Sequence, residues 1–399
     1  MIPFQEARAY VLDRCPTPVV GRVGLGGARG LVTAEPIIAL GDVPPFDNTA
    51  MDGFAVRSAD TVGSPVDLVV VGTLPAGKPP EVSVGPREAV RIMTGAVIPP
   101  GADSVVMVEK TQTSDDGMTV TVDVTVGPGN HIRSAGEDLR AGEEVFPAGT
   151  VLGPGHIGVL ASIGRTEVPV FRRPTVGVLS TGDELVDGSA ELAPGQIRDA
   201  NRHALLSLLE ETGVVAVDLG LVSDTEAAVE EALLDGVGIC DAVLTSGGVS
   251  MGDFDYVKVV LDRIGDMRWM QVAVKPAKPL AFGLVDGVPV FGLPGNPVSS
   301  MVSFELFARP VLRAMMGYQD LDRPRVEAVV DGGLVRRPDG RVHFARVVVN
   351  RREGLYWATS SGGQGSHQLS AMAAADGLAV LPDGDTLADG DTVEVLLLR

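Results

Sequence analysis

The sequence predicts a multidomain protein that combines α/β and all-β folds, with a central parallel α/β domain and flanking β-rich subdomains. Its 399 residues exceed what one simple core usually holds, so about two to four domains are expected. The 50 glycines and 28 prolines indicate many turns and short strands. A strand–helix–strand pattern begins near residue 171 and is typical of a parallel sheet.

The N-terminal 170 residues are predicted to be mostly β-structure. Residues 1–40 hold an amphipathic helix in MIPFQEARAYVLDRC, then a strand-like run; residues 41–127 hold short β-like runs such as DLVVVG and SVVMVE; residues 128–170 hold turns and short strands. The stretch GRVGLGGARG lacks the G-x-G-x-x-G spacing of a dinucleotide loop. We interpret it as a flexible turn.

The alternation of strands and helices occupies residues 171–317. PTVGVLS and CDAVLTSGG are predicted strands. ANRHALLSLLEETG is a predicted helix, because Leu205, Leu208 and Leu209 fall on one face and Gly213 can end it. PVSSMVSFELFARPVLRAMM is predicted to be the last long helix of this domain. Residues 318–399 return to β-like runs such as RVHFARVVV, which predict a small C-terminal β-barrel or sheet.

Composition excludes several classes of function. The formal net charge of −20 disfavours a protein that binds duplex nucleic acid or an anionic membrane surface. No uninterrupted apolar run reaches about 18 residues, so no membrane-spanning segment is expected. We expect a cytoplasmic protein. Two distant cysteines make neither a disulfide framework nor a CxxC zinc site. Five scattered histidines favour neither a metal spacing nor a Ser–His–Asp triad.

Three loops at the carboxyl ends of predicted strands carry the groups that bind anions. Ligands of open α/β sheets bind beyond these ends, and backbone N–H groups and hydroxyls hold phosphates there. The alternative to anion binding, for each loop, is that its glycines and prolines only form a turn. The loops contain Thr181, Gly182, Asp183 and Glu184; Thr245, Ser246, Gly247, Gly248 and Asp253; and Pro294, Gly295, Asn296 and Pro297.

Basic and acidic side chains accompany these loops. Lys275 and Lys278 lie in VKPAKP, where the prolines restrain the backbone, and the whole chain has only five lysines. Carboxylates beside phosphates most often hold Mg²⁺. The candidate carboxylates are Asp52, Asp138, Glu184 and Asp224. Two of them have an ordinary alternative: Asp224 could cap the following helix, and Asp52, in PPFDNTAMDGFAVR, could belong to a surface turn with Asp47.

Eight motifs in this order resemble the molybdopterin molybdenumtransferase family, which includes bacterial MoeA and the E domain of gephyrin and its plant counterpart. The resemblance covers essentially the whole chain. The motifs are PPFDNTAMDGFAVR, RIMTGAVIPPGADSVVMVE, HIRSAGED, VGVLSTGDEL, GQIRDANRHAL, TSGGVSMGDFDY, VKPAKPLAFG and GLPGNPVSSMVSFELFARPVL.

The resemblance implies an architecture and a reaction. It implies four subdomains: subdomain I in residues 1–40 and 128–170, subdomain II in 41–127, a MogA-like molybdopterin-binding subdomain III in 171–317, and a β-barrel subdomain IV in 318–399. It implies an elongated homodimer with the active site between subdomain III of one protomer and subdomains I and II of the other. The implied reaction is Mg²⁺-dependent insertion of molybdate into adenylylated molybdopterin, with release of AMP and formation of molybdenum cofactor.

The resemblance also implies roles for individual residues. Asp52, Asp138, Glu184, Asp224 and Lys275 match catalytic positions, with Glu184 and Asp224 as candidate metal ligands. The resemblance implies substrate binding by Thr94, Arg133, Pro294, Pro297, Arg346, Ser366 and Ser370, of which Arg346 and Ser370, with Ser366 nearby, would handle molybdate. The strand-end loops and VKPAKP add, as further expected substrate-binding residues, Thr181, Ser246, Gly247, Gly248, Asp253, Lys278, Gly295 and Asn296. The chain departs from the family at Gln271, where many members have lysine, and at Ala277, where glycine is common.

Two other functions stay open from the sequence. The α/β domain also resembles the enzyme that adenylylates molybdopterin, the preceding step. The E domain of gephyrin anchors a receptor peptide, so a scaffold is the non-enzymatic alternative. Molybdopterin adenylyltransferase and molybdoenzyme apoproteins are possible partners. Molybdate and tungstate are tetrahedral dianions of nearly equal size, and the sequence does not discriminate between them.

Overall fold

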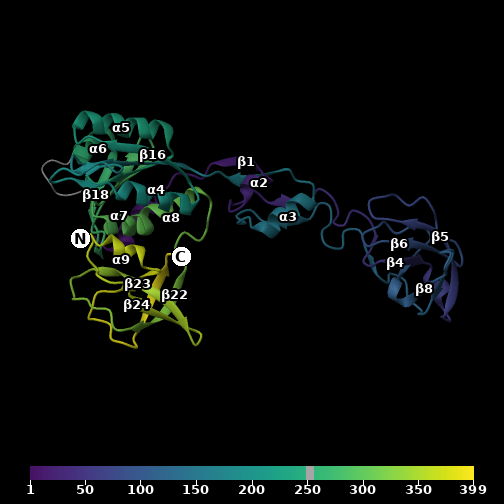
Figure 1. Ribbon diagram of the computed structural model, residues 1–399. Helices are drawn as coiled ribbons and strands as arrows, with labels where there is room; N and C mark the ends of the chain where they lie inside the picture. Colours follow the sequence, from purple (N-terminus) through teal and green to yellow (C-terminus); the bar gives the residue numbers. More distant parts are fainter. Residues whose placement is uncertain (249–255) are drawn as a thin grey trace. The chain divides into compact units, whose positions relative to one another are not determined.

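The computed structural model describes residues 1–248 and 256–399, and the chain forms two compact units. The larger unit comprises Met1–Arg22, Gly30–Ala34 and Pro169–Arg399. The smaller unit comprises Val23–Arg29 and Glu35–Val168. The larger unit holds an α/β sheet and a β-barrel, and the smaller unit holds a β-rich sheet (Figure 1).

The central sheet of the larger unit has six strands in the order β16–β13–β17–β21–β20–β18. The four parallel strands are β16 (Val215–Val222), β13 (Thr175–Thr181), β17 (Ala242–Ser246) and β21 (Val288–Leu293). β20 (Pro279–Val285) is antiparallel to β21. β18 (Asp266–Gln271) is antiparallel to β20 and therefore runs in the direction of the four parallel strands. The predicted α/β domain is confirmed, but its sheet is mixed rather than wholly parallel.

A two-residue turn explains the antiparallel edge. Asp286 and Gly287 join β20 to β21 and have φ of 50° and 82°. Such paired positive φ values close a tight β-hairpin, and a strand that reverses through a hairpin can only pair antiparallel with its neighbour.

Helices cover both faces of this sheet. α5 (Glu226–Ile239) and α6 (Tyr256–Ile264) lie on one face, and α4 (Asn201–Thr212), α7 (Pro297–Ser303) and α8 (Arg309–Met315) lie on the other (Figure 1). The side chains of β17 alternate between the two faces of the sheet. Ala242 and Leu244 pack in the core that contains α4 and α7, whereas Val243 packs in the core that contains α5 and α6. Successive strand side chains point to opposite faces, so a strand buried on both sides is apolar throughout.

The predicted helices of this unit are confirmed. Leu205, Leu208 and Leu209 of α4 are buried, and Gly213, with φ of 92°, ends the helix. The predicted last long helix consists of α7, a π-helical segment (Phe304–Ala308) and α8 in direct succession. The N-terminal helix α1 (Phe4–Leu12) places Ala7 and Val11 in the core shared with α4. Within the described residues, no helix is long and apolar enough to cross a membrane.

The C-terminal strands close into a barrel, as predicted. The order is β23 (Val342–Arg352), β24 (Leu355–Ser360), β22 (Arg325–Asp331), β26 (Thr392–Leu397) and β25 (Gly377–Leu381), and β25 pairs back to β23. The short helix α9 (Leu369–Ala373) precedes β25. β19 (Val274–Lys275) pairs with β23 and sets Lys275 opposite His343. The VKPAKP segment therefore leaves the central sheet and joins the barrel.

The smaller unit is built on a six-stranded sheet, which agrees with the predicted β-rich texture. Its order is β7 (Ser104–Met107), β4 (Gly53–Val56), β6 (Glu88–Ile92), β5 (Val66–Leu74), β9 (Thr119–Val122) and β8 (Thr111–Thr113). Two short pairs join β2 (Ile37–Ile38) to β11 (Glu144–Phe146) and β3 (Asn48–Thr49) to β10 (Ile132–Arg133). This unit also contains α3 (Pro154–Ser162) and the 3₁₀ turns Ser58–Thr61 and Val108–Lys110.

The glycine-rich stretch near residue 25 is not the flexible turn that we expected. It forms β1 (Val20–Gly24), which pairs with β12 (Glu167–Phe171), followed by the single helical turn α2 (Leu25–Ala28). A strand does therefore precede a helix here, although the glycine spacing of a dinucleotide loop is still missing. The division into four subdomains at residues 40, 127, 170 and 317 stays a prediction.

Candidate functional site

Three carboxylates gather beyond the ends of two neighbouring strands. Asp183 and Glu184 follow β13, and Asp224 follows β16, which pairs with β13. The Asp183 carboxylate accepts a hydrogen bond from the Asp224 backbone N–H at 3.2 Å. Partial burial and then the charges of Asp183 and Glu184 raise the pKa of Asp224, because both effects disfavour a further negative charge. A cation bound here would relieve that repulsion.

Asp224 does not cap the following helix. Thr225 occupies the N-cap of α5, and its hydroxyl oxygen accepts a hydrogen bond from the Ala228 backbone N–H at 3.4 Å. The helix-cap alternative considered from the sequence is therefore wrong, because Thr225 and not Asp224 is the N-cap residue.

The acid cluster can supply part of a metal site but not a closed one. Across residues 1–248 and 256–399, no group of three or more His, Cys, Asp and Glu side chains could by itself hold a metal ion. Mg²⁺ usually takes one or two protein carboxylates together with phosphate oxygens and water. The glycine at 182 has φ of 148°, and a Cβ there would lie 2.7 Å from the Glu184 carboxylate. This glycine therefore makes room for Glu184, and the donors present fit an open Mg²⁺ site.

The three predicted anion loops meet at this edge of the sheet. The Gly247 backbone N–H donates to the Leu293 carbonyl at 3.1 Å. The Asn201 side chain, at the start of α4, donates to the Ser246 hydroxyl at 2.8 Å and to the Gly295 carbonyl at 2.7 Å. Gly247 has φ of 97°, and a Cβ there would lie 3.2 Å from the Thr181 carbonyl oxygen. The ends of β13, β17 and β21 are thus joined by direct contacts.

Several backbone N–H groups of these loops remain available to a ligand. The N–H groups of Gly248, Gly295 and Asn296 donate to none of the residues that the structure describes. Successive unpaired N–H groups in such turns form a concave donor surface for anions. Pro294 is buried, and Pro297 begins α7 and has no N–H to donate. Asp253, the remaining residue predicted for these loops, lies outside the described residues.

The two lysines of VKPAKP are exposed on a tight loop. Neither Lys275 nor Lys278 forms an ion pair within the described part of the chain. The loop is held by the Val272 N–H, which donates to the Lys278 carbonyl at 2.7 Å. Ala277 is 1% exposed and has φ of 75°, a left-handed conformation that glycine adopts more easily. Gln271, exposed at the end of β18, brings no charge to this loop.

A buried arginine of the barrel lies under a loop that reaches the anion loops. Arg346 of β23 is 0% exposed, and its Nη2 donates to the carbonyls of Gly363 at 2.7 Å and Gly365 at 3.2 Å. Its Nε and Nη1 atoms are buried and have no hydrogen-bond partner among the residues that the structure describes. Burial lowers the pKa of this guanidinium. In the same loop, the Ser366 carbonyl accepts a hydrogen bond from the Val298 N–H of α7 at 3.0 Å. Ser370 lies exposed in α9.

Four site residues were predicted in the smaller unit: Asp52, Thr94, Arg133 and Asp138. The last three each pair with a residue of the segment 43–52. The Asp52 carboxylate accepts hydrogen bonds from the Thr94 hydroxyl and backbone N–H, both at 2.6 Å. These bonds lower the pKa of Asp52, the hydroxyl contributing more. Arg133 pairs with Asn48 in the β3–β10 ladder. The Asp138 N–H donates to the Val43 carbonyl, and the residue is exposed.

Asp47 and Asp52 have different surroundings. One Asp47 carboxylate oxygen accepts a hydrogen bond from the Ala135 backbone N–H at 2.8 Å. The Asp47 carbonyl accepts another from the Ile98 N–H at 3.0 Å. Asp47 therefore ties distant loops together, rather than bonding within its own turn, whereas only Thr94 holds the exposed Asp52 carboxylate among the described residues.

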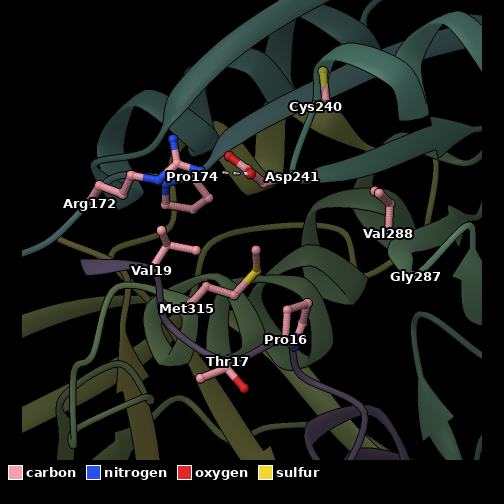
Figure 2. A pocket seen from close by; sticks show the side chains of 10 residues that line it. All are labelled: Pro16, Thr17, Val19, Arg172, Pro174, Cys240, Asp241, Gly287, Val288 and Met315. Carbon is pink, nitrogen blue, oxygen red and sulfur yellow. Dashed lines mark hydrogen bonds and ion pairs between the residues drawn. The ribbon is translucent and has the colours of Figure 1, made fainter. Parts of the chain in front are cut away.

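One pocket of the larger unit lies at the amino ends of the parallel strands, away from the strand-end loops described above. It encloses about 180 Å³ between residues that precede the parallel strands, including Pro174, Asp241 and Gly287 (Figure 2). Its main polar groups are already paired: Asp241 accepts a hydrogen bond from the Thr175 N–H at 2.7 Å and lies 3.4 Å from the Arg172 guanidinium. Because ligands of such sheets bind at the carboxyl ends of strands, this pocket is not the candidate site.

Sequence reasoning missed Asn201 and gave Asp183 no role. The structure shows Asn201 bridging two loops and Asp183 in contact with Asp224. The signal for Asp183 was its place in the same strand-end loop as Glu184. Asn201 lay within a recognised motif, GQIRDANRHAL, but no local pattern indicated that its side chain would reach residues 45 and 94 positions away.

The fold and the glycine-rich, acid-lined edge of its sheet define a multidomain α/β protein with a candidate anion-binding site. Three family profiles match the chain: "MoeA N-terminal region (domain I and II)" over residues 2–164, "Probable molybdopterin binding domain" over 177–314, and "MoeA C-terminal region (domain IV)" over 334–398. The chain belongs to the molybdopterin molybdenumtransferase family, as the sequence motifs predicted, and is an enzyme of molybdenum cofactor biosynthesis.

Full-length relatives support this assignment. The molybdopterin molybdenumtransferase of Haemophilus influenzae is 38% identical over 399 residues, which cover 99% of this chain and 98% of the relative. Molybdopterin molybdenumtransferase 2 of Mycobacterium tuberculosis is 39% identical over 99% of this chain and 97% of its own length. A crystal structure of the molybdopterin biosynthesis MoeA protein from Pyrococcus horikosii has a TM-score of 0.85 and 32% identity, covering 100% of this chain and 99% of its own.

Proposed function

We propose that this enzyme inserts molybdate into adenylylated molybdopterin in a Mg²⁺-dependent reaction that releases AMP and forms molybdenum cofactor. Water attacks the phosphoanhydride bond of the adenylylated pterin, so AMP leaves and the pterin keeps its own phosphate. The two thiols of the dithiolene replace one oxygen of molybdate, which departs with their protons as water. The observation that carries this proposal is the convergence of three strand-end loops, unpaired N–H groups and a carboxylate cluster at one sheet edge. That edge supplies donors for phosphates together with ligands for a cation that would neutralise them.

The residues divide between two parts of the substrate. Thr181, Ser246 and the N–H groups of Gly248 and Gly295 hold the pterin phosphate and pyrophosphate, with Gly247, Asn296, Pro294 and Pro297 shaping the loops. Lys275 and Lys278 add positive charge near the phosphates. Arg346, Ser366 and Ser370 handle molybdate, since the Arg346 guanidinium lacks a negative partner among the described residues. The protein contributes mostly positioning and charge neutralisation.

Glu184 and Asp224 would hold the Mg²⁺ ion, with Asp183 beside them. When bound, the ion supplies positive charge that offsets the phosphoanhydride and the leaving AMP. Without a cation, partial burial and the charges of Asp183 and Glu184 disfavour a further negative charge on Asp224 and raise its pKa. The available ligands leave coordination positions for phosphate oxygens and water.

Asp52, Asp138, Thr94 and Arg133 complete the site from another protomer of a homodimer. The support for this part is the resemblance of their motifs and the exposure of the Asp52 carboxylate, which only Thr94 holds within the described structure. A cytoplasmic location and transient contacts with molybdopterin adenylyltransferase and molybdoenzyme apoproteins fit a protein that receives an adenylylated pterin and passes on a finished cofactor. Chemical cross-linking of the purified protein would test the dimer.

Metal insertion with purified substrate tests the reaction. The enzyme, adenylylated molybdopterin, Mg²⁺ and molybdate are expected to yield AMP and molybdenum cofactor, and omission of molybdate or Mg²⁺ should suppress the cofactor. A parallel reaction with molybdopterin and Mg-ATP examines adenylylation, and formation of the adenylylated pterin there without metal insertion would contradict the proposal. A third reaction with tungstate reports which oxyanion is preferred.

Asp224→Asn should raise thermal stability in metal-free buffer while lowering turnover. A raised carboxyl pKa means that ionisation destabilises the folded state, so the penalty is absent below about pH 4 and present at neutral pH. The variant should therefore gain about 1–2 °C in Tm at pH 7.5 and nothing at pH 3.5. Scanning calorimetry with and without Mg²⁺ checks this, and Mg²⁺ should stabilise the wild type more. Equal Mg²⁺ responses would count against Asp224 as a ligand.

A further inference from the structure

Asn201 has a carboxamide whose orientation its surroundings determine. Its Nδ2 lies 2.7 Å from the Gly295 carbonyl oxygen and 2.8 Å from the Ser246 hydroxyl oxygen. A carbonyl oxygen can only accept a hydrogen bond, so the Asn201 atom that faces Gly295 must be the NH₂ nitrogen. The second hydrogen of the same nitrogen is then available to the Ser246 oxygen. Asn201 therefore donates to both loops.

This arrangement leaves the hydroxyl proton of Ser246 free for a ligand. Ser246 accepts from Asn201, and its hydroxyl donates to none of the residues in the described structure. Ser246 is 3% exposed and lies at the end of β17. Two residues further on is Gly248, whose N–H donates to none of the described residues. A buried hydroxyl that already accepts one bond gains most by donating to an acceptor-only group, and the oxygens of a phosphate are such acceptors.

The same side chain also sets the direction of the Gly295–Asn296 peptide. Because a trans peptide is planar, its C=O and N–H point to opposite sides. Asn201 draws the Gly295 carbonyl toward α4, so the Asn296 N–H points away from α4. That N–H is one of the loop donors without a partner among the described residues. Asn201 thereby directs two donors, one on each loop.

Buried neighbours hold Asn201 in place. The Asp199 carboxylate accepts a hydrogen bond from the Ser180 hydroxyl of β13 and another from the Arg202 N–H, both at 3.2 Å. The Arg202 Nε donates to Asp199 at 3.0 Å, and its other nitrogens donate to the carboxylates of Asp187 and Asp218. Asp199 and Arg202 are 5% and 2% exposed. The start of α4 is thus anchored to β13, while Asn201 reaches the ends of β17 and β21.

We propose that Asn201 is a positioning residue that directs the Ser246 hydroxyl proton and the Asn296 N–H toward a phosphate group of the pterin substrate. The inference rests on the proposed function, because it needs an oxyanion bound at these loops. Asn201 itself need not touch the substrate; its effect passes through Ser246 and the Gly295–Asn296 peptide.

A double-mutant cycle tests the coupling between Asn201 and Ser246. Asn201→Ala, Ser246→Ala and the double variant are compared with the wild type by the Kd for molybdopterin and the rate of AMP release from the adenylylated pterin. Each single variant is expected to weaken binding about 10-fold, since a hydrogen bond to a charged group is worth roughly 1.5 kcal/mol or more. The double variant should lose little more than the worse single variant. Additive losses would overturn the proposal.

Asn201→Asp separates donor direction from space filling. The substituted side chain has nearly the same shape but an acceptor-only carboxylate, which repels the Gly295 carbonyl and competes for the Ser246 proton. It should therefore bind molybdopterin more weakly than Asn201→Ala does. A residue that merely fills space would give the reverse ranking, and that ranking would overturn the proposal. If Asn201→Ala fails to fold, Asn201→Asp takes its place in the cycle.

The outcomes distinguish this inference from the proposed function. Wild-type binding by Ser246→Ala would remove the anion site at β17 and the inference with it. Impaired binding by Ser246→Ala together with wild-type binding by both Asn201 variants would overturn the inference alone. Asn350→Ala, at an exposed asparagine of β23, serves as the matched control and should bind molybdopterin like the wild type.

Discussion

Asp52→Ala is expected to abolish AMP release from adenylylated molybdopterin while the protein remains folded. The carboxylate is exposed, so its removal leaves no buried group unpaired. Its hydrogen bonds with Thr94 lower its pKa and so favour its charged form. Loss of a charged group that acts in the transition state typically costs about 100-fold or more in rate. AMP release followed by chromatography, with Tm as a check on folding, measures the effect. Turnover at the wild-type rate would remove Asp52 from the site.

Mixing two inactive variants tests whether Asp52 acts across the proposed dimer. Asp52→Ala and Lys275→Ala should each be inactive alone. If each site takes Asp52 from one protomer and Lys275 from the other, a heterodimer contains one intact site. Random exchange then restores about a quarter of the wild-type rate, because half of the dimers are mixed and half of their sites are intact. If each site instead took both residues from one protomer, every site in the mixture would carry one of the two substitutions. The mixture would then stay inactive.

The sequence predicted the elements of the fold well because local patterns determine them. Leu205, Leu208 and Leu209 recur at helical spacing, and Gly213 can adopt the left-handed conformation that ends α4. The antiparallel edge was missed although Asp286 and Gly287 form a recognisable hairpin dipeptide. The strand–helix alternation before them favoured a parallel sheet, and that broader pattern outweighed two residues.

The candidate site was harder to predict because its contacts join distant residues. The strand-end loops could be found individually, since glycine, serine and carboxylate residues follow apolar strands. Their contacts could not: Asn201 reaches Ser246 and Gly295, and Asp183 reaches Asp224, only because the sheet order places β13 between β16 and β17. The capping role of Thr225 in place of Asp224 depends on where α5 begins, and helix boundaries are uncertain from sequence by about two residues. Nothing in the sequence around Arg346, RVHFARVVV, indicated that its charged side chain would be buried.

Arg346→Met should abolish metal insertion without a comparable loss of stability. The guanidinium is 0% exposed, and its Nε and Nη1 atoms have no partner in the described part of the chain. The desolvation of these two atoms is therefore a cost that no hydrogen bond among the described residues offsets. Methionine has a similar length and removes that cost, which can be neutral or stabilising. The two hydrogen bonds from Nη2 to Gly363 and Gly365 are lost, at about 1 kcal/mol each. We therefore expect a free energy of unfolding within about 2 kcal/mol of the wild type.

The functional loss should concern molybdate and not the pterin. Because the pterin phosphate is assigned to the loops of the α/β sheet, Arg346→Met should keep the wild-type Kd for molybdopterin while cofactor formation falls about 100-fold or more. Arg336→Met provides a matched comparison in the same barrel. Its guanidinium is also buried but donates to the Leu381 carbonyl at 2.8 Å and to the Asp383 carboxylate at 2.7 Å, so its loss should destabilise the protein clearly. An Arg346→Met variant that unfolds readily yet retains its rate of metal insertion would make this arginine a structural residue. The expected result is a stable protein that binds the pterin but does not insert the metal. It would indicate that the buried charge of Arg346 is retained for the reaction, although it does not stabilise the fold.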